Sequence, residues 1–456
     1  MTSNQQTVIV GAGFTGLFTA LHLSHQNYPH PIILIDRSER FCFKPLLYEY
    51  FSSDLDAMQV VPRYSDLLEG SGVTFVQDTV ESIDLPQKQV KLTSGKSYDY
   101  NHLVLGLGSV PSYAKVAGAE ENALPFWTQK DAIAIDNHLR ECLRQAVETE
   151  DNALRQRLLT IAMIGGGPSG VEMAATLADF VPIWYSALNG NPKEVRVVLF
   201  NHGDVILKGD VNVNLQKTAE KELQQRTAPV EMVMGAKVSG IHSDCIEYQR
   251  DGKAETLAVG TTIWTAGSTI HPLIKELPIP ATQRDERGRL IVSKTMQLAD
   301  FPEVFVGGDC AVVKDTTLPA TAQVAYQQGA TIAHNLQAIA CGHPLKPVHV
   351  SLRGTLLKLG LHNAAANIFD TIEIDGEIAH LIRQATYLEL LPTPIHNFKA
   401  TSEWLKEDVV ERYMNGNSVV GKTVAQAGEL VNTAVAGVMA ARKLLQKLGD
   451  DHPRQS

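Results

Sequence analysis

The sequence predicts an α/β fold in which two doubly wound parallel sheets are followed by a third, helix-rich part. The chain has 456 residues, which at about 150 residues per domain corresponds to three folding units. An apolar run, the pattern G-x-G-x-x-G and helical spacing follow one another twice, at residues 7–23 and 161–177. Hydrophobic residues are 44% and charged residues 20% of the chain, which is typical of globular proteins and not of disordered or polytopic membrane proteins.

The first glycine motif consists of Gly11, Gly13 and Gly16 and follows a short apolar run that predicts a buried parallel strand. Glycines at this spacing allow a tight turn, close backbone approach to a pyrophosphate and close contact between helix and strand. Asp36 stands 20 residues after Gly16, at the end of the next apolar run. A carboxylate there can accept hydrogen bonds from the ribose hydroxyls of adenosine. We therefore expect a Rossmann-like dinucleotide site; the alternative is a tight turn followed by an exposed acid.

The second motif, Gly165, Gly167 and Gly170, lacks this carboxylate. Its second strand is predicted over residues 195–200 and is followed by Asn201. A carboxylate at that place hydrogen-bonds the 2′-hydroxyl of NADH but repels the 2′-phosphate of NADPH, and an asparagine removes the repulsion. The site is therefore expected to accept NADPH. Two alternatives stay open: Asn201 could bond the ribose of NADH, or the strand could end a residue or two away.

Three further strand-and-turn segments determine the predicted domain order. Residues 102–109 and 262–267 end in glycines where the chain leaves each nucleotide domain, and residues 304–309 end in Gly307, Gly308 and Asp309. Asp309 can hydrogen-bond the hydroxyls of a ribityl chain, although a plain turn would use the same residues. A helix is predicted from residue 322, so the chain returns to its first domain. The expected division is a flavin domain of residues 1–115 and 293–345, a nicotinamide domain of residues 116–292, and a C-terminal region of residues 346–456.

Charge and cysteine content exclude several other classes of protein. Forty Lys and Arg against 50 Asp and Glu give a net charge of −10, which argues against nucleic acid as a partner. Five widely separated cysteines exclude a disulfide scaffold, a cysteine-rich zinc module and a neighbouring dithiol, and the histidines show no metal-binding spacing, so we expect no metal. The first six residues lack the features of a signal peptide, and no apolar stretch has the length of a spanning helix. Any membrane contact is therefore expected to be peripheral.

Together these motifs resemble the two-dinucleotide-binding-domain flavoproteins, whose fold is like that of glutathione reductase, over residues 7–345. Residues 321–329, TAQVAYQQG, are similar to the A-Q-x-A-x-Q-Q segment of type II NAD(P)H:quinone oxidoreductases. Residues 43–48, FKPLLY, resemble the loop after the second strand in that family, and residues 383–398 are similar to its cyanobacterial members.

The resemblance implies FAD as a cofactor, NADH or NADPH as the hydride donor, and a membrane quinone as the acceptor. It places Gln323 and Gln327 in the quinone channel, which fits their i and i+4 spacing on one helix face. It places Glu172 near the nicotinamide and quinone ends of the flavin. The alternatives are ordinary polar helix positions for the glutamines and a helix-terminus role for the acid. Further cofactor contacts are expected at the matched positions Lys44, Gly108, Gly267, Asp309 and Ala322.

The cysteines allow two competing functions. Cys42 follows the second strand, where some relatives of this superfamily carry a cysteine that cycles through a sulfenic acid in soluble NAD(P)H oxidases and peroxidases. Cys42 can equally be a small buried residue. Cys142 and Cys310 could imitate the separated cysteines of sulfide:quinone reductases. The preferred mechanism needs neither, because electrons leave the flavin directly for the quinone.

The C-terminal region has 12 basic and 12 acidic residues, whereas the rest of the chain is acidic. An amphipathic helix predicted over residues 378–391, with Lys399, Trp404 and Lys406 beyond it, suits a membrane interface. A second helix is predicted over residues 424–448. We expect a peripheral protein on the cytoplasmic face of a plasma or thylakoid membrane that uses plastoquinone, a naphthoquinone precursor or menaquinone. The apolar stripe could instead pack on the body of the protein or form a homodimer interface.

Overall fold

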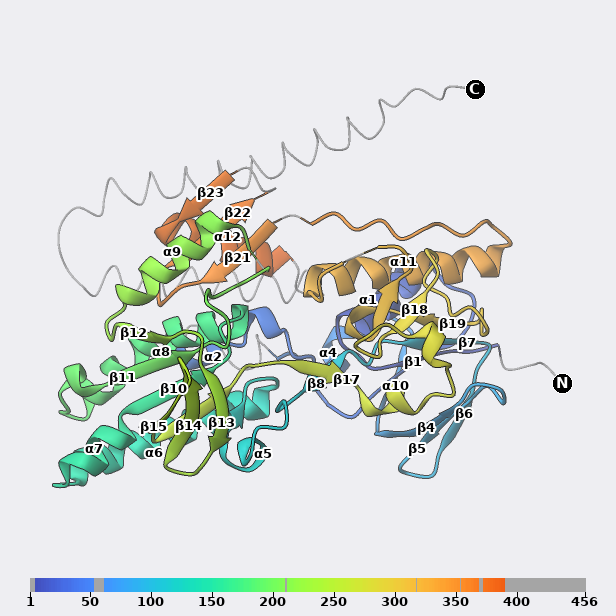
Figure 1. The fold of residues 1–456 in the computed structure, drawn as a ribbon. Helices are drawn as coiled ribbons and strands as arrows, with labels where there is room; N and C mark the ends of the chain where they lie inside the picture. Colours follow the sequence, from blue (N-terminus) through green and yellow to red (C-terminus); the bar gives the residue numbers. More distant parts are fainter. Residues whose placement is uncertain are drawn as a thin grey trace, which may run out of the picture. The chain divides into compact units, whose positions relative to one another are not determined.

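A computed structural model describes residues 5–52, 61–209, 211–316, 318–352, 354–368 and 372–389. The predicted helix over residues 424–448 and the residues 399–406 lie outside these ranges. In the described part of the chain, no helix is both long enough and apolar enough to span a membrane. The predicted α/β fold with two parallel sheets is confirmed, as Figure 1 shows.

The first sheet is wholly parallel and has the strand order β19-β7-β1-β2-β3. Its strands are β1 (Thr7–Val10), β2 (Ile32–Asp36), β3 (Thr74–Gln77), β7 (His102–Leu105) and β19 (Val304–Val306). The last of these strands comes from a segment about 200 residues further along the chain than β7 and pairs with it through Phe305 and Val104. Parallel strands buried on both faces explain why β1 is apolar from Val8 to Val10.

Two helices lie together on this sheet, α1 (Phe14–His25) and α11 (Ala322–Cys341) (Figure 1). The hydroxyl of Thr15 donates to the carbonyl of Ala325 at 3.2 Å, and the hydroxyl of Thr19 donates to the carbonyl of Gly329 at 3.1 Å. A Cβ on Gly329 would lie 2.6 Å from the Thr15 carbonyl oxygen, so the glycine allows the two helices to touch. This contact brings the glutamines of α11 to the start of α1.

The second sheet is also parallel and has the order β12-β11-β10-β16-β9. Its strands are β9 (Leu124–Pro125), β10 (Thr160–Ile164), β11 (Arg196–Phe200), β12 (Val230–Val233) and β16 (Thr261–Trp264). The helices around it are α5 (Ala119–Asn122), α6 (Gln129–Glu148), α7 (Asn152–Leu158), α8 (Pro168–Ala187) and α9 (Val213–Gln224). Helix α6 begins in a capping box, in which the Thr128 hydroxyl accepts from the Asp131 backbone and the Asp131 carboxylate accepts from the Thr128 backbone.

Smaller elements complete the two halves. The short pair β8 (Ser109–Pro111) and β17 (Ser268–Ile270) is antiparallel and lies where the chain passes between the two large sheets. Two antiparallel sheets consist of β4 (Val80–Asp84), β5 (Gln89–Leu92) and β6 (Ser97–Asp99), and of β13 (Lys237–Ile241), β14 (Cys245–Arg250) and β15 (Lys253–Ala258). The remaining elements are α2 (Glu49–Ser52), α4 (Tyr64–Leu67), α10 (Pro272–Glu276), β18 (Leu290–Val292) and β20 (Ala311–Val313).

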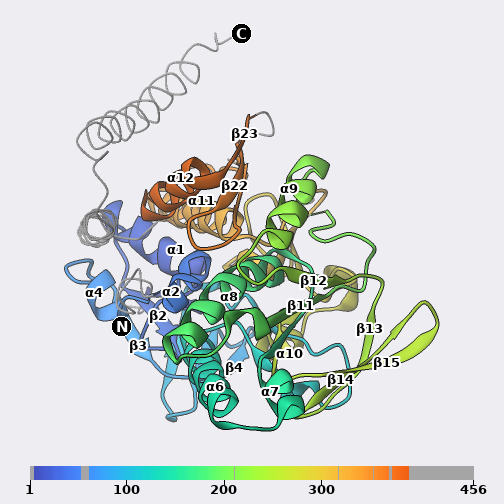
Figure 2. The ribbon, with the colours of Figure 1, turned by 90° about the vertical axis from the view of Figure 1, so that its left-hand side faces the viewer.

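The described C-terminal part differs from the predicted α-rich region. Three antiparallel strands, β21 (Gly354–Lys358), β22 (Ala364–Ile368) and β23 (Ile372–Asp375), precede the helix α12 (Gly376–Glu389) (Figure 2). The helix begins two residues earlier than predicted. Its residue Ile378 is 61% exposed, whereas Ala379, His380 and Arg383 are buried. The buried side of α12 therefore carries two basic residues, which the amphipathic pattern did not predict.

Candidate functional site

In the first glycine motif, backbone packing requires glycine at Gly11 and Gly16 but not at Gly13. Gly11 has φ +91°, and a Cβ there would lie 2.7 Å from the Gly106 carbonyl oxygen. A Cβ on Gly16 would lie 1.9 Å from the Gly11 carbonyl oxygen. A Cβ on Gly13 would meet only the Gly106 oxygen, at 3.9 Å. The space beside Gly13, at the N-terminus of α1, therefore fits the pyrophosphate of a dinucleotide.

The second motif repeats this arrangement. Gly165 has φ +122°, and its Cβ would lie 2.9 Å from the Ala266 backbone nitrogen. A Cβ on Gly170 would lie 1.8 Å from the Gly165 carbonyl oxygen, whereas a Cβ on Gly167 would have no neighbour within 4 Å. The start of α8 thus repeats the backbone geometry found at the start of α1, with open space beside its central glycine that would suit a second pyrophosphate.

Asp36 and Asn201 occupy equivalent positions. The Gly11 backbone N–H donates to the Ile35 carbonyl at 2.9 Å, and the Gly165 N–H donates to the Phe200 carbonyl at the same distance. Asp36 and Asn201 therefore follow matching positions of the two strands, and the second strand ends at Phe200, as predicted.

These two side chains make different local bonds. Asp36 accepts from the backbone N–H of Ala12 and of Ser38, each at 2.8 Å. The Asn201 side-chain nitrogen instead donates to the carbonyls of Gly203 at 3.0 Å and Val205 at 2.8 Å. Asn201 thus holds its own loop in place and brings no negative charge to the second site.

Asp309 lies between the first sheet and α11. The hydroxyl of Ser109 donates to its carboxylate at 2.8 Å, next to the predicted Gly108. Gly308 has φ +75°, and its N–H donates to the Gln328 side chain at 2.7 Å. Asp309 and Gln328 line one pocket together with the start of α11. The donors and acceptors gathered here fit the ribityl hydroxyls of FAD, and sequence reasoning missed Ser109 and Gln328.

The other predicted cofactor positions lie at turns or helix starts. Gly108 and Gly267 have φ values of +64° and +75°, and a Cβ would meet no atom within 4 Å at Gly108 and only the Ser112 carbonyl oxygen, at 3.5 Å, at Gly267. Ala322 is the first residue of α11, after the N-cap Thr321. The two glycines leave open space on one side, as a cofactor would require.

Cys42 and Lys44 both follow β2, and burial shifts the pKa of each toward its uncharged form. The Lys44 ammonium lies 3.5 Å from the centroid of the Trp127 ring. Desolvation lowers the pKa of Lys44, and the neighbouring Asp309 opposes this effect. Burial raises the pKa of the Cys42 thiol to about 11, so this thiol stays protonated at neutral pH and is not an activated nucleophile. All five cysteines are free, and burial raises the pKa of Cys310 to about 12.

Gln323 and Gln327 face the segment that leads into β21. The Gln323 side-chain nitrogen donates to the Gly354 carbonyl at 3.0 Å. The Gln327 side chain donates to the Ser351 carbonyl at 3.0 Å and accepts from the Ser351 N–H at 2.9 Å. The two amides lie on one face of α11, as predicted, and they hold this backbone segment against the helix.

Glu172 is buried in α8 and meets the far end of the same strand. The Lys358 backbone N–H donates to the Glu172 carboxylate at 2.8 Å, and the Tyr48 hydroxyl hydrogen-bonds to it. Burial raises the pKa of Glu172, although the charge of Arg383 and these hydrogen bonds act in the opposite direction. β21 contacts Gln323 at its start and Glu172 at its end, and Gln327 binds Ser351 just before the strand, so the three predicted catalytic residues adjoin this strand or the segment that precedes it.

Sequence reasoning missed three buried charged residues beside Glu172. Glu49, Lys358 and Arg383 each have 0% exposure, and both cations pair with the carboxylate of Glu49. The one signal in the sequence is Lys358, a lone charge within the apolar run of residues 356–361. Glu49 and Arg383 lie in segments without such a signal.

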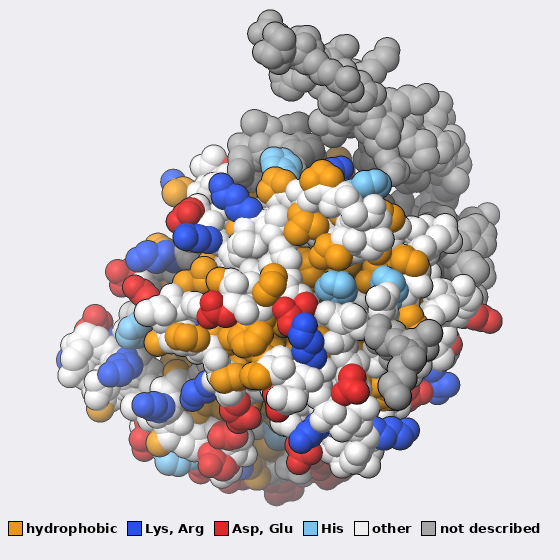
Figure 3. Space-filling view, turned by 90° about the vertical axis from the view of Figure 1, so that its right-hand side faces the viewer, with side chains coloured by type: hydrophobic (Ala, Val, Ile, Leu, Met, Phe, Trp, Pro, Cys, Tyr) orange, Lys and Arg blue, Asp and Glu red, His pale blue; other side chains and the backbone are white. Residues whose placement is uncertain are grey.

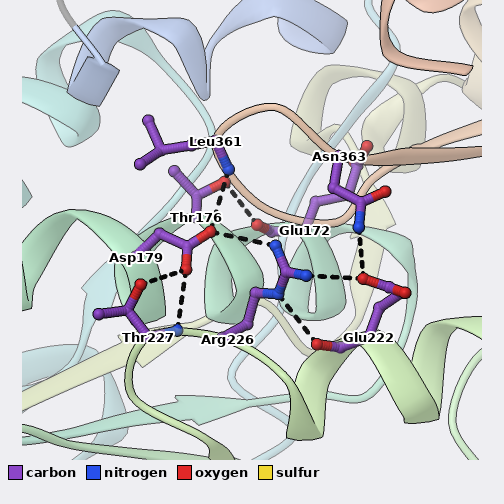
Figure 4. Close-up of polar contacts among 8 residues, drawn as sticks. All are labelled: Glu172, Thr176, Asp179, Glu222, Arg226, Thr227, Leu361 and Asn363. Carbon is purple, nitrogen blue, oxygen red and sulfur yellow. Dashed lines mark hydrogen bonds and ion pairs between the residues drawn. The ribbon is translucent and has the colours of Figure 1, made fainter. Parts of the chain in front are cut away.

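A second polar cluster, drawn in Figure 4, fastens the C-terminal sheet to α8 and α9. Arg226 pairs with Asp179 at 3.2 Å and with Glu222 at 2.6 Å. Asp179 also accepts from the Leu361 N–H at 3.1 Å. A Cβ on Gly360 would lie 2.0 Å from an Arg226 nitrogen, so the turn after β21 can approach this cluster only with glycine. The cluster positions β21 and with it the contact to Glu172.

Comparisons with known proteins agree with this geometry. The family model described as pyridine nucleotide-disulphide oxidoreductase matches residues 5–329. An alternative NAD(P)H-ubiquinone oxidoreductase C1 of Arabidopsis thaliana is 29% identical, over 88% of this chain and 81% of its own length. The demethylphylloquinone reductase NdbB of a Synechocystis species is 30% identical, over 87% of this chain and 95% of its own length.

A solved structure shows the same fold. The NDH2 of Plasmodium falciparum in complex with NADH superimposes with a TM-score of 0.79 at 17% identity, covering 89% of this chain and 98% of that chain. The resemblance found in the sequence motifs is thereby confirmed, including its cyanobacterial side. The chain belongs to the pyridine nucleotide-disulphide oxidoreductase family and, within it, to the type II NAD(P)H:quinone oxidoreductases.

Proposed function

We propose that this chain uses FAD to pass a hydride from NADH or NADPH to a membrane quinone, in the overall reaction NAD(P)H + H⁺ + quinone → NAD(P)⁺ + quinol. The observation that carries the proposal is the pair of glycine cradles, each with open space at its central glycine, in a chain whose cysteines are all free. Two dinucleotide sites without a dithiol leave direct electron transfer from flavin to acceptor as the simplest chemistry.

The residues present fit this chemistry. When bound, FAD would accept a hydride and release two electrons. Gly13 and Asp36 would hold its pyrophosphate and adenosine ribose, and Asp309 its ribityl hydroxyls. Gly167 and Asn201 would hold the nicotinamide dinucleotide, with no carboxylate to repel a 2′-phosphate. The expected domain limits, residues 1–115 with 293–345 and residues 116–292, belong to the same proposal.

The quinone site is proposed at the contact between α11, β21 and α8. Gln323 and Gln327 are the proposed wall and add no charge beside the quinone. The two N–H groups of Gln327 donate to the carbonyls of Gln323 and Ser351, so this amide shapes the wall by holding the backbone. The quinone takes up two electrons and two protons, of which one derives from the hydride and one from solvent. Glu172, a buried carboxyl with a raised pKa, is suited to hold the second proton beside the acceptor. Plastoquinone, a naphthoquinone precursor and menaquinone all fit such a site.

The test is an assay of the purified yellow protein with a short-chain quinone, using NADH and NADPH, with and without peroxide. Quinone-dependent turnover of about ten per second or more supports the proposal. Turnover that needs peroxide and ignores quinone would instead favour a soluble peroxidase, and the protonated thiol of Cys42 argues against that outcome. Replacement of Cys42 by serine should leave quinone reduction unchanged.

We further propose that the C-terminal region docks the protein on the membrane surface that contains the quinone. Figure 3 shows the side of the protein that lies to the right in Figure 1, where acidic and basic side chains lie among and around the hydrophobic ones. Because β21 to α12 pack into the body of the protein, the informative truncation ends after residue 389. The truncated protein should keep its flavin and leave the membrane fraction. A homodimer through this region is the other proposal, and the mass of the full-length and truncated proteins in solution tests it.

A further inference from the structure

Three fully buried charges form a closed group next to the proposed proton-holding residue. Glu49 comes from α2, Lys358 from β21 and Arg383 from α12, and each side chain has 0% exposure. The Lys358 ammonium binds one oxygen of Glu49, and the Arg383 guanidinium binds the other at 2.8 Å. Arg383 also donates to the Pro45 carbonyl at 2.8 Å. The group therefore joins the C-terminal helix to the loop that follows β2.

The same two cations act on Glu172. The backbone of Lys358 donates to the Glu172 carboxylate, and the charges of Lys358 and Arg383 both favour its ionised form. Burial acts in the opposite direction and is the larger effect. The same two cations thus bind Glu49 directly and act on Glu172 through their charge, while the pKa of Glu172 stays raised.

The other titratable groups around Glu172 contribute no charge near neutral pH. His380 on α12 has a pKa of about 4 because of burial, and burial raises the pKa of Tyr387 to about 12. Burial also raises the pKa of Tyr48 well above its ordinary value. Glu49 is the carboxylate that pairs directly with both Lys358 and Arg383, the two cations whose charges act on Glu172.

We infer that Glu49 is an internal counter-ion that keeps Glu172 available for proton transfer: by neutralising Lys358 and Arg383, it lets the neighbouring carboxyl hold a proton beside the quinone. Glu49 is thus a positioning residue that acts through the two cations and touches neither quinone nor flavin. This inference rests on the proposed function for the role of the proton, while the charge arrangement itself does not depend on it.

The charge arrangement predicts the direction of each change. Without the Glu49 carboxylate, two uncompensated cations favour ionised Glu172, so its proton is lost at a lower pH. Without the Lys358 charge, ionised Glu172 is less favoured and the proton is retained to a higher pH. A nearby unit charge moves the pKa of a buried carboxyl by about one unit or more, which changes the protonated fraction about tenfold.

The experiment uses full-length, flavin-loaded protein as wild type, Glu49→Gln, Lys358→Met and the double variant. The protonation of Glu172 is read from the infrared carbonyl band of its neutral carboxyl as a function of pH, with Glu172→Gln to assign the band. The alkaline limb of the pH profile of quinone reduction is measured in parallel. Flavin content and thermal unfolding show whether each variant has folded.

We expect the band and the alkaline limb to move down by about one pH unit or more in Glu49→Gln, up in Lys358→Met, and back toward wild type in the double variant. A band that keeps its pH midpoint in Lys358→Met and in the double variant overturns the inference, even where Glu49→Gln fails to fold. If the band moves as expected but the wild type shows no quinone turnover, the counter-ion role of Glu49 toward Glu172 stands and the proposed function fails.

Discussion

The side-chain amide of Gln327 pairs with the backbone of Ser351 in both directions, accepting at 2.9 Å and donating at 3.0 Å. This is the pattern that a neighbouring strand would provide, but it comes from a helix. Gln323 adds a bond to Gly354, so two amides one turn apart fix the segment that enters β21. The two glutamines of the proposed quinone wall therefore hold the start of the strand whose end hydrogen-bonds to Glu172.

Replacement of Gln327 by leucine removes both hydrogen bonds to Ser351. The N–H and C=O groups of Ser351 must then hydrogen-bond to water. We expect kcat/KM for quinone to fall about tenfold or more, corresponding to 1–2 kcal/mol, while reduction of the bound flavin by NADH keeps its rate. Stopped-flow reduction and steady-state assays separate the two steps. Gln337→Leu, on the same helix ten residues away, is the matched control. An equal loss in both variants would contradict the assignment.

Local patterns predicted the two sheets and the cradles because each depends on contiguous residues: an apolar strand, a glycine turn and a helix start. The charge group around Glu49 could not be predicted in this way, because its partners lie 309 and 334 residues away in the chain. Strand β22 was missed for another reason. Its sequence Ala-Ala-Ala-Asn-Ile favours a helix locally, but two flanking strands supply backbone partners that override the propensity.

The central glycines of the two cradles should be dispensable for folding but not for cofactor binding. In Gly13→Ala the added Cβ lies in space that the protein leaves open, so the apoprotein should unfold at the same temperature as wild type. Its affinity for FAD should fall about tenfold or more. Gly16→Ala is the contrasting variant, because its Cβ would lie 1.9 Å from the Gly11 oxygen and should prevent folding of this turn. Apoprotein melting and FAD titration give both results; an unchanged affinity in Gly13→Ala would refute the placement.

Asn201→Asp should shift the preference from NADPH toward NADH. The new carboxylate stands where Asp36 stands in the first site and would repel a 2′-phosphate, so the ratio of kcat/KM for NADPH to that for NADH should fall about tenfold or more. The ratio is the correct measure, because loss of the donors to Gly203 and Val205 affects both cofactors equally. A wild type that already prefers NADH about a hundredfold would disprove the idea.

Gly360→Ala should destabilise the protein through the cluster of Figure 4. The new Cβ would lie 2.0 Å from an Arg226 nitrogen and 2.5 Å from an Asp179 oxygen, at a φ of +133°. We expect the free energy of unfolding to fall by about 2–4 kcal/mol. Gly376→Ala is the control, since its φ is also positive but its Cβ would meet no atom within 4 Å, and strain alone should amount to about 1 kcal/mol. Equal midpoints of urea unfolding for the two variants would show that the cluster is unimportant.

We expect His380 to make the protein sensitive to mild acid. Burial lowers its pKa from 6.5 to about 4, and its Nδ1 has no hydrogen-bond partner among the described residues. Between these two values the unfolded chain binds a proton that the folded chain excludes, so stability falls as the pH falls from 6.5 to 4. The whole effect is at most about 3 kcal/mol. The pKa of Glu49 is lowered from 4.5 to about 2 by its two cationic partners. Its contribution to stability is therefore lost only as the pH falls below 4.5.

The pH ranges separate the two groups. Between pH 6.5 and 4.5, His380→Gln should flatten the dependence of the urea midpoint on pH, because the variant has no imidazole to protonate on unfolding. His362→Gln is the matched control, since this exposed histidine lies 6.2 Å from His380, ring centroid to ring centroid. Below pH 4 the His380 variant should lose stability as steeply as wild type, since the pairs of Glu49 with Lys358 and Arg383 remain. A His380 variant that follows the wild-type curve from pH 6.5 to 4.5 would show that this imidazole is protonated in the folded state, which the burial beside two cations opposes.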